Sequence, residues 1–140
     1  MRYLLDTCVV SELVARDPNQ QVIDWIDGVD PEAIYLSVIT IGEIRKGIEK
    51  LADSKRKSML QQWLEDELLV RFSGRILPID SGVMLTWGQM IGRLELSGKK
   101  MAAMDSLIAA IVSHANLILV TRNEGDFQHS GVQILNPWKA

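Results

Sequence analysis

Four acidic residues lie in or directly after apolar segments, where an unpaired charge is costly. They are Asp6 after residues 3–5, Glu43 within 38–44, Asp105 within 101–110 and Asp126 after 117–120. Burying an unpaired carboxylate carries a desolvation penalty that a protein rarely tolerates without a counter-charge. A shared divalent cation is the simplest common explanation for all four, and they are therefore the candidate catalytic and metal-binding residues.

The residue types favour Mg²⁺, or Mn²⁺, over zinc. Two unit charges about 4 Å apart repel by roughly 4 kcal/mol at an effective dielectric near 20, so converging carboxylates need a cation, and both ions prefer oxygen ligands. Zinc prefers cysteine and histidine, and the chain offers only Cys8, His114 and His129, without ligand spacing. The nearby hydroxyls of Thr7, Ser11 and Thr121 can orient carboxylates or bound water.

Hydrophobic periodicity predicts an α/β fold that would position these acids. We predict strands over 2–6, 33–37, 76–80, 117–121 and 132–135, and helices over 9–14, 19–27, 38–51, 54–72, 82–96 and 101–114. Alternating strands and helices indicate a mainly parallel central sheet of four to five strands flanked by helices. Ligands of such sheets bind beyond the carboxyl ends of the strands, where Asp6 and Thr121 are expected.

The length and composition of the chain restrict the classes of protein to which it can belong. The 140 residues, 47% of them hydrophobic, suit a single domain over 1–140, and the net charge of −3 argues against a general polyanion binder. No apolar stretch reaches the length of a membrane span, and Asp6 comes too early for a signal peptide. With only Cys8 and no disulfide framework, we expect a soluble, cytoplasmic protein.

The acids and their neighbours resemble the PIN-domain ribonucleases, especially VapC-type toxins of type II (VapBC) toxin–antitoxin systems. The matching segments are 5–13 (LDTCVVSEL), 37–44 (SVITIGEI), 105–110 (DSLIAA) and 121–127 (TRNEGDF). The resemblance implies a PIN-like three-layer fold and a Mg²⁺-dependent endoribonuclease whose metal site is built by Asp6, Glu43, Asp105 and Asp126. It also implies a cognate VapB-type antitoxin as partner, an RNA substrate and a homodimer.

Two positions depart from the family pattern. Cys8 stands where relatives often have asparagine, and no proline closely precedes Asp105. Neither departure removes a candidate metal ligand. They bear on local backbone shape and on the choice of RNA.

Three of the four acids also have a purely structural interpretation. Asp6 can cap the following helix, Asp105 suits the first turn of a helix, and Asp126 by itself reads as a loop residue. Asp80 is interpreted as a helix cap, and Glu12 as a solvent-facing residue.

The basic residues have two interpretations as well. The group Arg45, Lys46, Lys50, Lys55, Arg56 and Lys57 is either a solvated face or a track for RNA phosphates. Arg122, beside the fourth acidic segment, is the better single candidate for an RNA contact near the site. The tryptophans are expected mostly in the core or at interfaces.

The sequence also bears on three alternative functions. A phospho-receiver domain needs two adjacent acids early in the chain, and a haloacid-dehalogenase-like phosphatase needs an aspartate where Cys8 stands. A PIN-like module that binds RNA without cleaving it would not need the complete set of acids. Apolar helix faces around Val9, Val10, Leu13 and Val14, and around Leu60, Trp63 and Leu64, have two interpretations: they form dimer and antitoxin contacts, or they belong entirely to the core.

Overall fold

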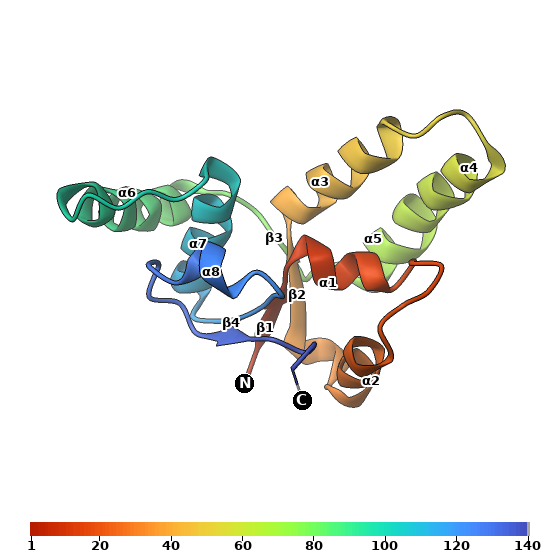
Figure 1. Ribbon diagram of the computed structural model, residues 1–140, viewed down its shortest axis with the longest axis horizontal. Helices are drawn as coiled ribbons and strands as arrows, with labels where there is room; N and C mark the ends of the chain where they lie inside the picture. The colour runs from red at the N-terminus through yellow and green to blue at the C-terminus, as the bar shows by residue number, and fades with distance from the viewer. Residues whose placement is uncertain (140) are drawn as a thin grey trace.

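A computed structural model describes residues 1–139 (Figure 1). The strands are β1 (Tyr3–Leu5), β2 (Ile34–Ser37), β3 (Ile76–Leu77), β4 (Ile118–Val120) and β5 (Ile134–Leu135). The helices are α1 (Thr7–Glu12), α2 (Gln20–Gly28), α3 (Val38–Glu49), α4 (Lys55–Gln62), α5 (Leu69–Arg71), α6 (Ser81–Leu96), α7 (Ala103–Ala115) and α8 (Glu124–Phe127), with a 3-10 turn η1 (Pro31–Ala33) and a π-helical segment η2 (Trp63–Leu68).

The strands form one parallel sheet in the order β3-β2-β1-β4-β5. In the centre, Leu4 of β1 lies opposite Tyr35 of β2 and Leu119 of β4. Because every strand runs in the same direction, the residues that follow β1, β2 and β4 meet at one edge. The predicted mainly parallel α/β sheet is confirmed.

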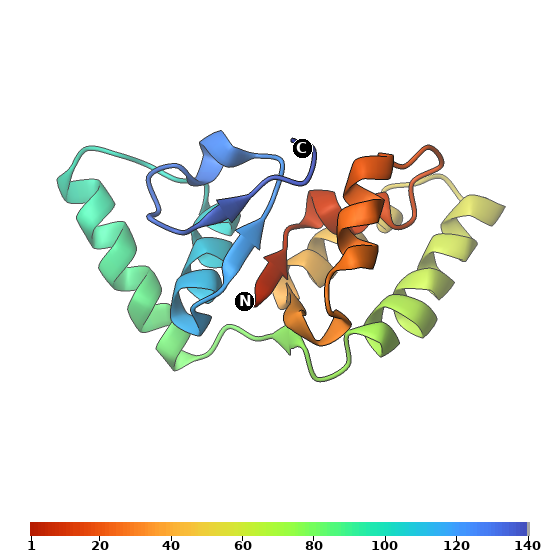
Figure 2. The ribbon, with the colours of Figure 1, turned by 90° about the horizontal axis from the view of Figure 1, so that it is seen from below.

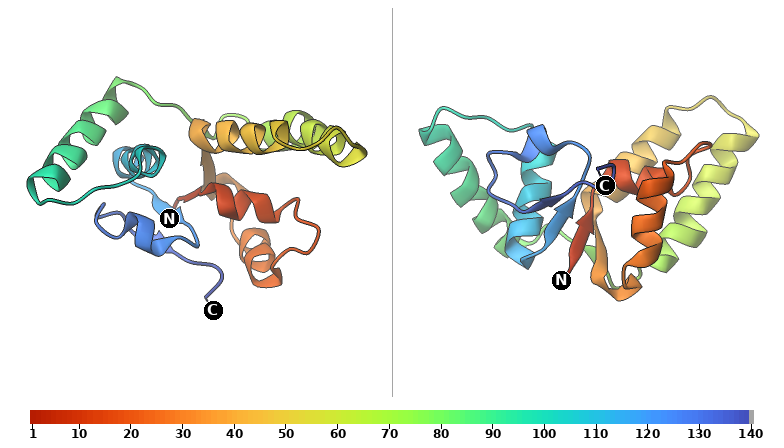
Figure 3. Two further views of the ribbon diagram at one scale, coloured as in Figure 1. Left: turned by 45° about the horizontal axis from the view of Figure 1, so that its top comes forward. Right: turned by 60° about the horizontal axis from the view of Figure 1, so that its bottom comes forward.

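Both faces of the sheet are covered by helices, which gives the three-layer fold expected from the family resemblance. Leu4 and Leu119 pack toward α7, whereas the alternate residues Leu5 and Val120 pack toward α1, α2 and the segment α4–η2. This alternation is that of a strand buried on both faces. Figures 1 and 2 show α6 and α7 on one side of the strands and α1 to α5 on the other, and Figure 3 shows α6 as the outermost helix of its side.

Several predicted boundaries differ from the structure for local reasons. β3 ends at Leu77, not at residue 80, because Pro78 has no N–H to continue the ladder. The helix predicted over 54–72 is continuous through α4, η2 and α5. The short helix α8 was not predicted. Asp80 caps α6 through a 2.9 Å hydrogen bond from the Val83 amide, as expected.

The structure corrects two surface assignments from the sequence. Val9, Val10, Leu60 and Leu64 are buried in the core and offer no docking surface, whereas Leu13, Val14 and Trp63 of the same helix faces are only half-buried. Glu12, predicted to face solvent, is half-buried and accepts a 3.0 Å hydrogen bond from the Asn19 amide. Among residues 1–139, no helix is long and apolar enough to cross a membrane.

Candidate active site

Asp6 is the buried centre of the site. It ends β1 and caps α1, and only 6% of its surface is exposed. Its Oδ1 accepts a 2.8 Å hydrogen bond from the Thr7 amide, and its Oδ2 accepts a 2.8 Å hydrogen bond from the Thr121 hydroxyl. The helix-cap interpretation is therefore correct, and it is compatible with a second role because each carboxylate oxygen has a further lone pair.

Glu43 is tied to the same place from α3. Its Oε1 accepts a 2.7 Å hydrogen bond from the Thr7 hydroxyl, whose oxygen also lies 3.0 Å from that of Thr40. Thr40 is completely buried, and Ser37 caps α3 by accepting from the Thr40 amide. Thr7 thus bridges the first and second acidic segments. Sequence reasoning did not select Thr40 or Ser37, although a hydroxyl within an apolar segment was the available signal.

Asp105 lies in the first turn of α7, facing the same edge of the sheet. The neighbouring Ser106 hydroxyl donates to the Ala103 carbonyl at 2.6 Å and accepts a 2.9 Å hydrogen bond from the Trp87 indole of α6. These bonds hold the first turn of α7 where no side chain caps the helix. Trp87 is consequently a support of the site and not only an apolar anchor.

Asp126 lies on α8, one helical turn after the segment that follows β4. Phe127, the next residue, is buried in the core and anchors this short helix. The Thr121 hydroxyl accepts a 3.0 Å hydrogen bond from the Asn123 amide while donating to Asp6. One buried hydroxyl therefore couples the first acid to the start of the segment that carries the fourth.

The expectation that all four acids are buried is wrong. Asp6 is buried and Asp105 half-buried, but Glu43 and Asp126 are exposed. Because the carboxyl ends of the strands form an open edge, the site has a buried floor and a solvent-exposed rim. An exposed rim is what a polymeric substrate requires.

The electrostatics show that the four carboxylates influence one another. Burial raises the pKa of Asp6; the Thr121 hydroxyl and Thr7 amide partly oppose this, and the charges of Glu43 and Asp126 add to it. Burial also raises the pKa of Asp105, followed by the charges of Asp126, Asp6 and Glu43. The acids thus share one negative field.

The donor set fits a magnesium ion, although it does not form a closed cage. Within residues 1–139, no three cysteine, histidine or acidic side chains stand close enough to enclose a metal. Mg²⁺ is usually held by only one or two carboxylates, with water and substrate phosphates completing its shell. An open set of oxygen donors, in which neighbouring charges help to raise the pKa of Asp6 and Asp105, suits that mode of binding.

Cys8 also belongs to this site. Its sulfur lies 3.9 Å from Asp6 Oδ2 and 3.7 Å from the Thr121 hydroxyl. Burial raises the pKa of the Cys8 thiol, with a smaller contribution from the Asp6 charge. The thiol is therefore kept protonated and is a poor nucleophile.

The remaining predicted support and RNA-contact residues lie on three different segments around the acids. Ser11 lines a groove with Thr7 and Glu43 between α1 and α3. Lys46 is exposed on α3 and lines a second hollow beside Glu43. Arg122 is exposed directly after Thr121, with its guanidinium 5.4 Å from the centre of the Trp138 ring.

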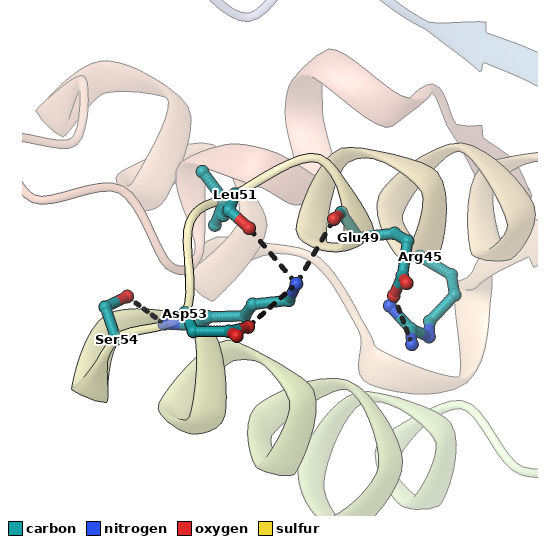
Figure 4. Close-up of polar contacts among 6 residues, drawn as sticks. Arg45, Glu49, Leu51, Asp53 and Ser54 are labelled. Carbon is teal, nitrogen blue, oxygen red and sulfur yellow. Dashed lines mark hydrogen bonds and ion pairs between the residues drawn. The ribbon is translucent and has the colours of Figure 1, made fainter.

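Half of the predicted basic track is used for structure. Arg45 pairs with Glu49, with their charged atoms 2.8 Å apart (Figure 4). The Lys57 ammonium group donates to the carbonyls of Glu49 and Leu51 and lies 3.5 Å from the carboxylate of Asp53. Arg56 donates a 2.9 Å hydrogen bond to the Val14 carbonyl. Lys57 thus fixes the turn between α3 and α4, Arg45 pairs within α3, and Arg56 ties α4 to the segment after α1, which favours the structural interpretation for these three residues.

Comparison with known proteins agrees with this architecture. The family described as PIN domain matches residues 3–131. Toxin FitB from Neisseria gonorrhoeae is 40% identical over 135 residues, covering 96% of this chain and 97% of that protein. VapC ribonuclease Y4jK from Sinorhizobium fredii is 35% identical over 136 residues, covering 97% of both. The crystal structure of FitAcB from Neisseria gonorrhoeae superposes with a TM-score of 0.93 at 39% identity, covering 99% of both chains.

Proposed function

Because the chain belongs to the PIN-domain family, we propose that it is an endoribonuclease and the toxin of a type II toxin–antitoxin system. The relatives named Toxin FitB and VapC ribonuclease match it along nearly the whole length. The observation that carries the proposal is the set of four mutually interacting carboxylates at the carboxyl edge of the sheet.

We propose Asp6, Glu43, Asp105 and Asp126 as the residues that hold Mg²⁺, with Mn²⁺ as a substitute. When bound, the ion supplies positive charge that stabilises the phosphodiester in its transition state and activates water as nucleophile. Asp6 is fixed by the Thr7 amide and the Thr121 hydroxyl, so its carboxylate cannot rotate away from the site. Thr7 holds Glu43 in the same way.

Hydrolysis by water, and not by a protein nucleophile, agrees with the state of the nearest thiol. The raised pKa of Cys8 leaves little thiolate at neutral pH. Burial and the neighbouring charges likewise raise the pKa of Asp6 and of Asp105, so the metal-free site disfavours the ionised form of these two carboxyls relative to water. Binding of a divalent cation reverses this preference and deprotonates the acids that hold it.

We further propose that a VapB-type antitoxin binds the toxin and that the toxin forms a homodimer, both in the cytoplasm. Because Val9, Val10, Leu60 and Leu64 are buried, the surface that we propose for the antitoxin is the groove formed by the half-buried and exposed residues beside them. It is lined by Leu13, Val14, Met59 and Trp63. Lys46 and Arg122 stay proposed RNA contacts, whereas Arg45 already pairs with Glu49.

Brief expression in cells, followed by sequencing of RNA ends, tests the activity. New 5′ ends should accumulate with the wild-type chain and not with Asp6→Asn, compared at equal protein levels. Asp80→Asn is the matched control, because this aspartate also follows a strand and caps a helix but lies outside the acidic group. Equal cleavage by Asp6→Asn would disprove the assigned site, and no cleavage by the wild type would disprove the function.

The metal requirement is tested separately with purified protein. Cleavage should stop in EDTA, return with Mg²⁺ or Mn²⁺, and not return with zinc at the same free concentration, because the donors are all oxygen. Full activity in excess chelator would show that the carboxylates act without a metal.

A further inference from the structure

Arg122, in the short segment between β4 and α8, is an exposed arginine whose backbone is held by its neighbours. Thr121 donates its amide to the Leu135 carbonyl at 3.0 Å, and the Asn123 amide donates to the Thr121 hydroxyl at 3.0 Å. The backbone amide of Arg122 itself is directed to the sulfur of Cys8. The backbone of Arg122 is thus fixed next to the hydroxyl that holds Asp6.

The side chain of Arg122 rests on an aromatic ring supplied by the end of the chain. Its guanidinium lies 5.4 Å from the centre of the Trp138 ring, within the range of a cation–π contact. Trp138 is half-buried against the core on the α1 side, and its amide donates a 3.0 Å hydrogen bond to the side-chain oxygen of Asn136. The ring is therefore a fixed support for the arginine.

A polar clamp holds that terminal segment against α8. The Asn136 side-chain amide donates a 2.9 Å hydrogen bond to Glu124 Oε2, and the Lys139 ammonium lies 2.6 Å from the same oxygen. These two contacts, Lys139 first, lower the pKa of Glu124. Residues 136–139 consequently connect the ring beneath Arg122 to the helix that carries Asp126.

The positive charge of Arg122 is not used in an ion pair within the described residues. The ion pairs among residues 1–139 involve Arg45, Lys57, Arg75 and Lys139, and none of them includes Arg122. A guanidinium stacked on a ring keeps its donors in its own plane, directed outward, where they match two oxygens of a phosphate. A positive group outside these ion pairs, carried by the residue next to Thr121, which holds Asp6, suits an anionic ligand that must approach the acids.

We propose that Arg122, supported by Trp138 and the clamp of residues 136–139, binds a backbone phosphate of RNA next to the phosphodiester that is cleaved. This inference rests on the proposed ribonuclease function and names how the substrate is seated. The contact involves phosphate only, so it positions any RNA sequence and does not select a base. Arg122 is thus a positioning residue and not a metal ligand.

The main test measures RNA binding in the absence of cleavage. A fluorescently labelled single-stranded RNA is titrated with the full chain in EDTA over a series of salt concentrations, and gels verify that the RNA stays intact. Loss of one phosphate contact on a single strand should reduce the slope of log affinity against log salt by about 0.7. Arg122→Gln should show this reduced slope. At about 0.1 M salt, its Kd for the RNA should be about 5-fold higher than that of the wild type.

Arg71 provides a matched control. It is an exposed arginine whose guanidinium lies 5.5 Å from the Phe72 ring, but it precedes β3 and therefore lies toward the opposite edge of the sheet. Arg71→Gln should leave both the slope and the Kd unchanged. Arg122→Lys should keep most of the slope because the charge remains. Trp138→Leu should weaken RNA binding, whereas Trp138→Phe, which keeps an aromatic ring under the arginine, should bind RNA as the wild type does.

The outcomes separate this inference from the function on which it rests. An unchanged slope for Arg122→Gln, or equal losses in Arg122→Gln and Arg71→Gln, overturns the phosphate contact and leaves the nuclease proposal intact. A Mg²⁺-dependent assay in which Arg122→Gln lowers kcat with KM unchanged also overturns it, since that pattern indicates a role in the transition state alone. A higher KM with kcat retained supports it.

Discussion

Replacing Asp6 by asparagine should have opposite effects on stability without and with magnesium. The amide is nearly isosteric with the carboxylate, so its oxygen can still accept from the Thr7 amide and its NH₂ can donate to the Thr121 hydroxyl. What changes is the charge. Burial and the neighbouring acids raise the pKa of Asp6, which means that the folded protein disfavours the ionised form.

The magnitude follows from two opposing terms. A carboxylate about 8 Å from another repels it by roughly 2 kcal/mol at an effective dielectric near 20, and the substitution removes this repulsion. Two hydrogen bonds to a charged acceptor become neutral ones, which costs about 0.5 kcal/mol each. We therefore expect metal-free Asp6→Asn to be more stable than the wild type by about 1 kcal/mol at neutral pH, which is about 3 °C in Tm for a chain of this size.

The pH dependence of unfolding independently predicts the sign of the stability difference between Asp6→Asn and the wild type. The folded pKa of Asp6 is raised above its ordinary value of 3.8, so the folded chain binds this proton more tightly than the unfolded chain. That contribution to stability is complete below about pH 3.8 and is lost as the pH rises through the raised folded pKa. The advantage of Asp6→Asn should accordingly be greatest at neutral pH and shrink as the pH falls.

Urea unfolding in EDTA and in Mg²⁺ measures both effects. Magnesium at about 100 times its Kd should stabilise the wild type by about 2.7 kcal/mol and leave Asp6→Asn nearly unchanged, so that the order of stability reverses. If Asp6→Asn is the less stable protein in EDTA, the N-cap role of Asp6 outweighs its charge and the electrostatic reasoning is wrong. If magnesium stabilises both proteins equally, Asp6 does not hold the ion.

Three further perturbations test the supports of the site. Thr121→Val leaves Asp6 Oδ2 and the Asn123 amide without their partner, and we expect a loss of about 2 kcal/mol in urea unfolding together with weaker Mg²⁺ binding; unchanged metal affinity would refute the positioning role. Trp87→Phe removes the 2.9 Å bond to Ser106 and should cost about 1 kcal/mol and lower kcat, whereas a fully active variant would show that α7 needs no such anchor. Asp80→Ala should cost about 1 kcal/mol through loss of the α6 cap with RNA cleavage unaffected, and reduced cleavage would mean that α6 reaches the site.

Much of the fold could be predicted because local patterns agree with the final structure. Strand positions followed from short apolar runs, and the cap at Asp80 followed from its place before a helix. The end of β3 was misplaced because apolar character at Ile79 outweighed the missing N–H of Pro78 in the sequence pattern. α8 was missed because a helix of four residues, Glu124–Phe127, has no hydrophobic period to detect and depends on the burial of Phe127.

The candidate acids were identified from residue type and apolar context, but their exposure was not. Nothing in the neighbours of Glu43 distinguishes a buried face of α3 from the rim of an open site. The same ambiguity led to the apolar residues Val9 and Leu60 being assigned to a partner surface, although both are buried in the core on the α1 side of the sheet. A hydrophobic period indicates which face of a helix is apolar, not what covers that face.

The sequence by itself determined which chemistry is available: four carboxylates, no zinc ligand set, and strands short and apolar enough for a parallel sheet. Only the tertiary structure decided which polar groups serve that chemistry. Thr7 meets Glu43, and Thr121 meets Asp6 across 115 positions, because parallel strands bring distant segments to one edge. The same folding places Trp138 beneath Arg122 and joins Arg56 to the Val14 carbonyl, since these partners are set by the packing of whole elements and not by distance along the chain.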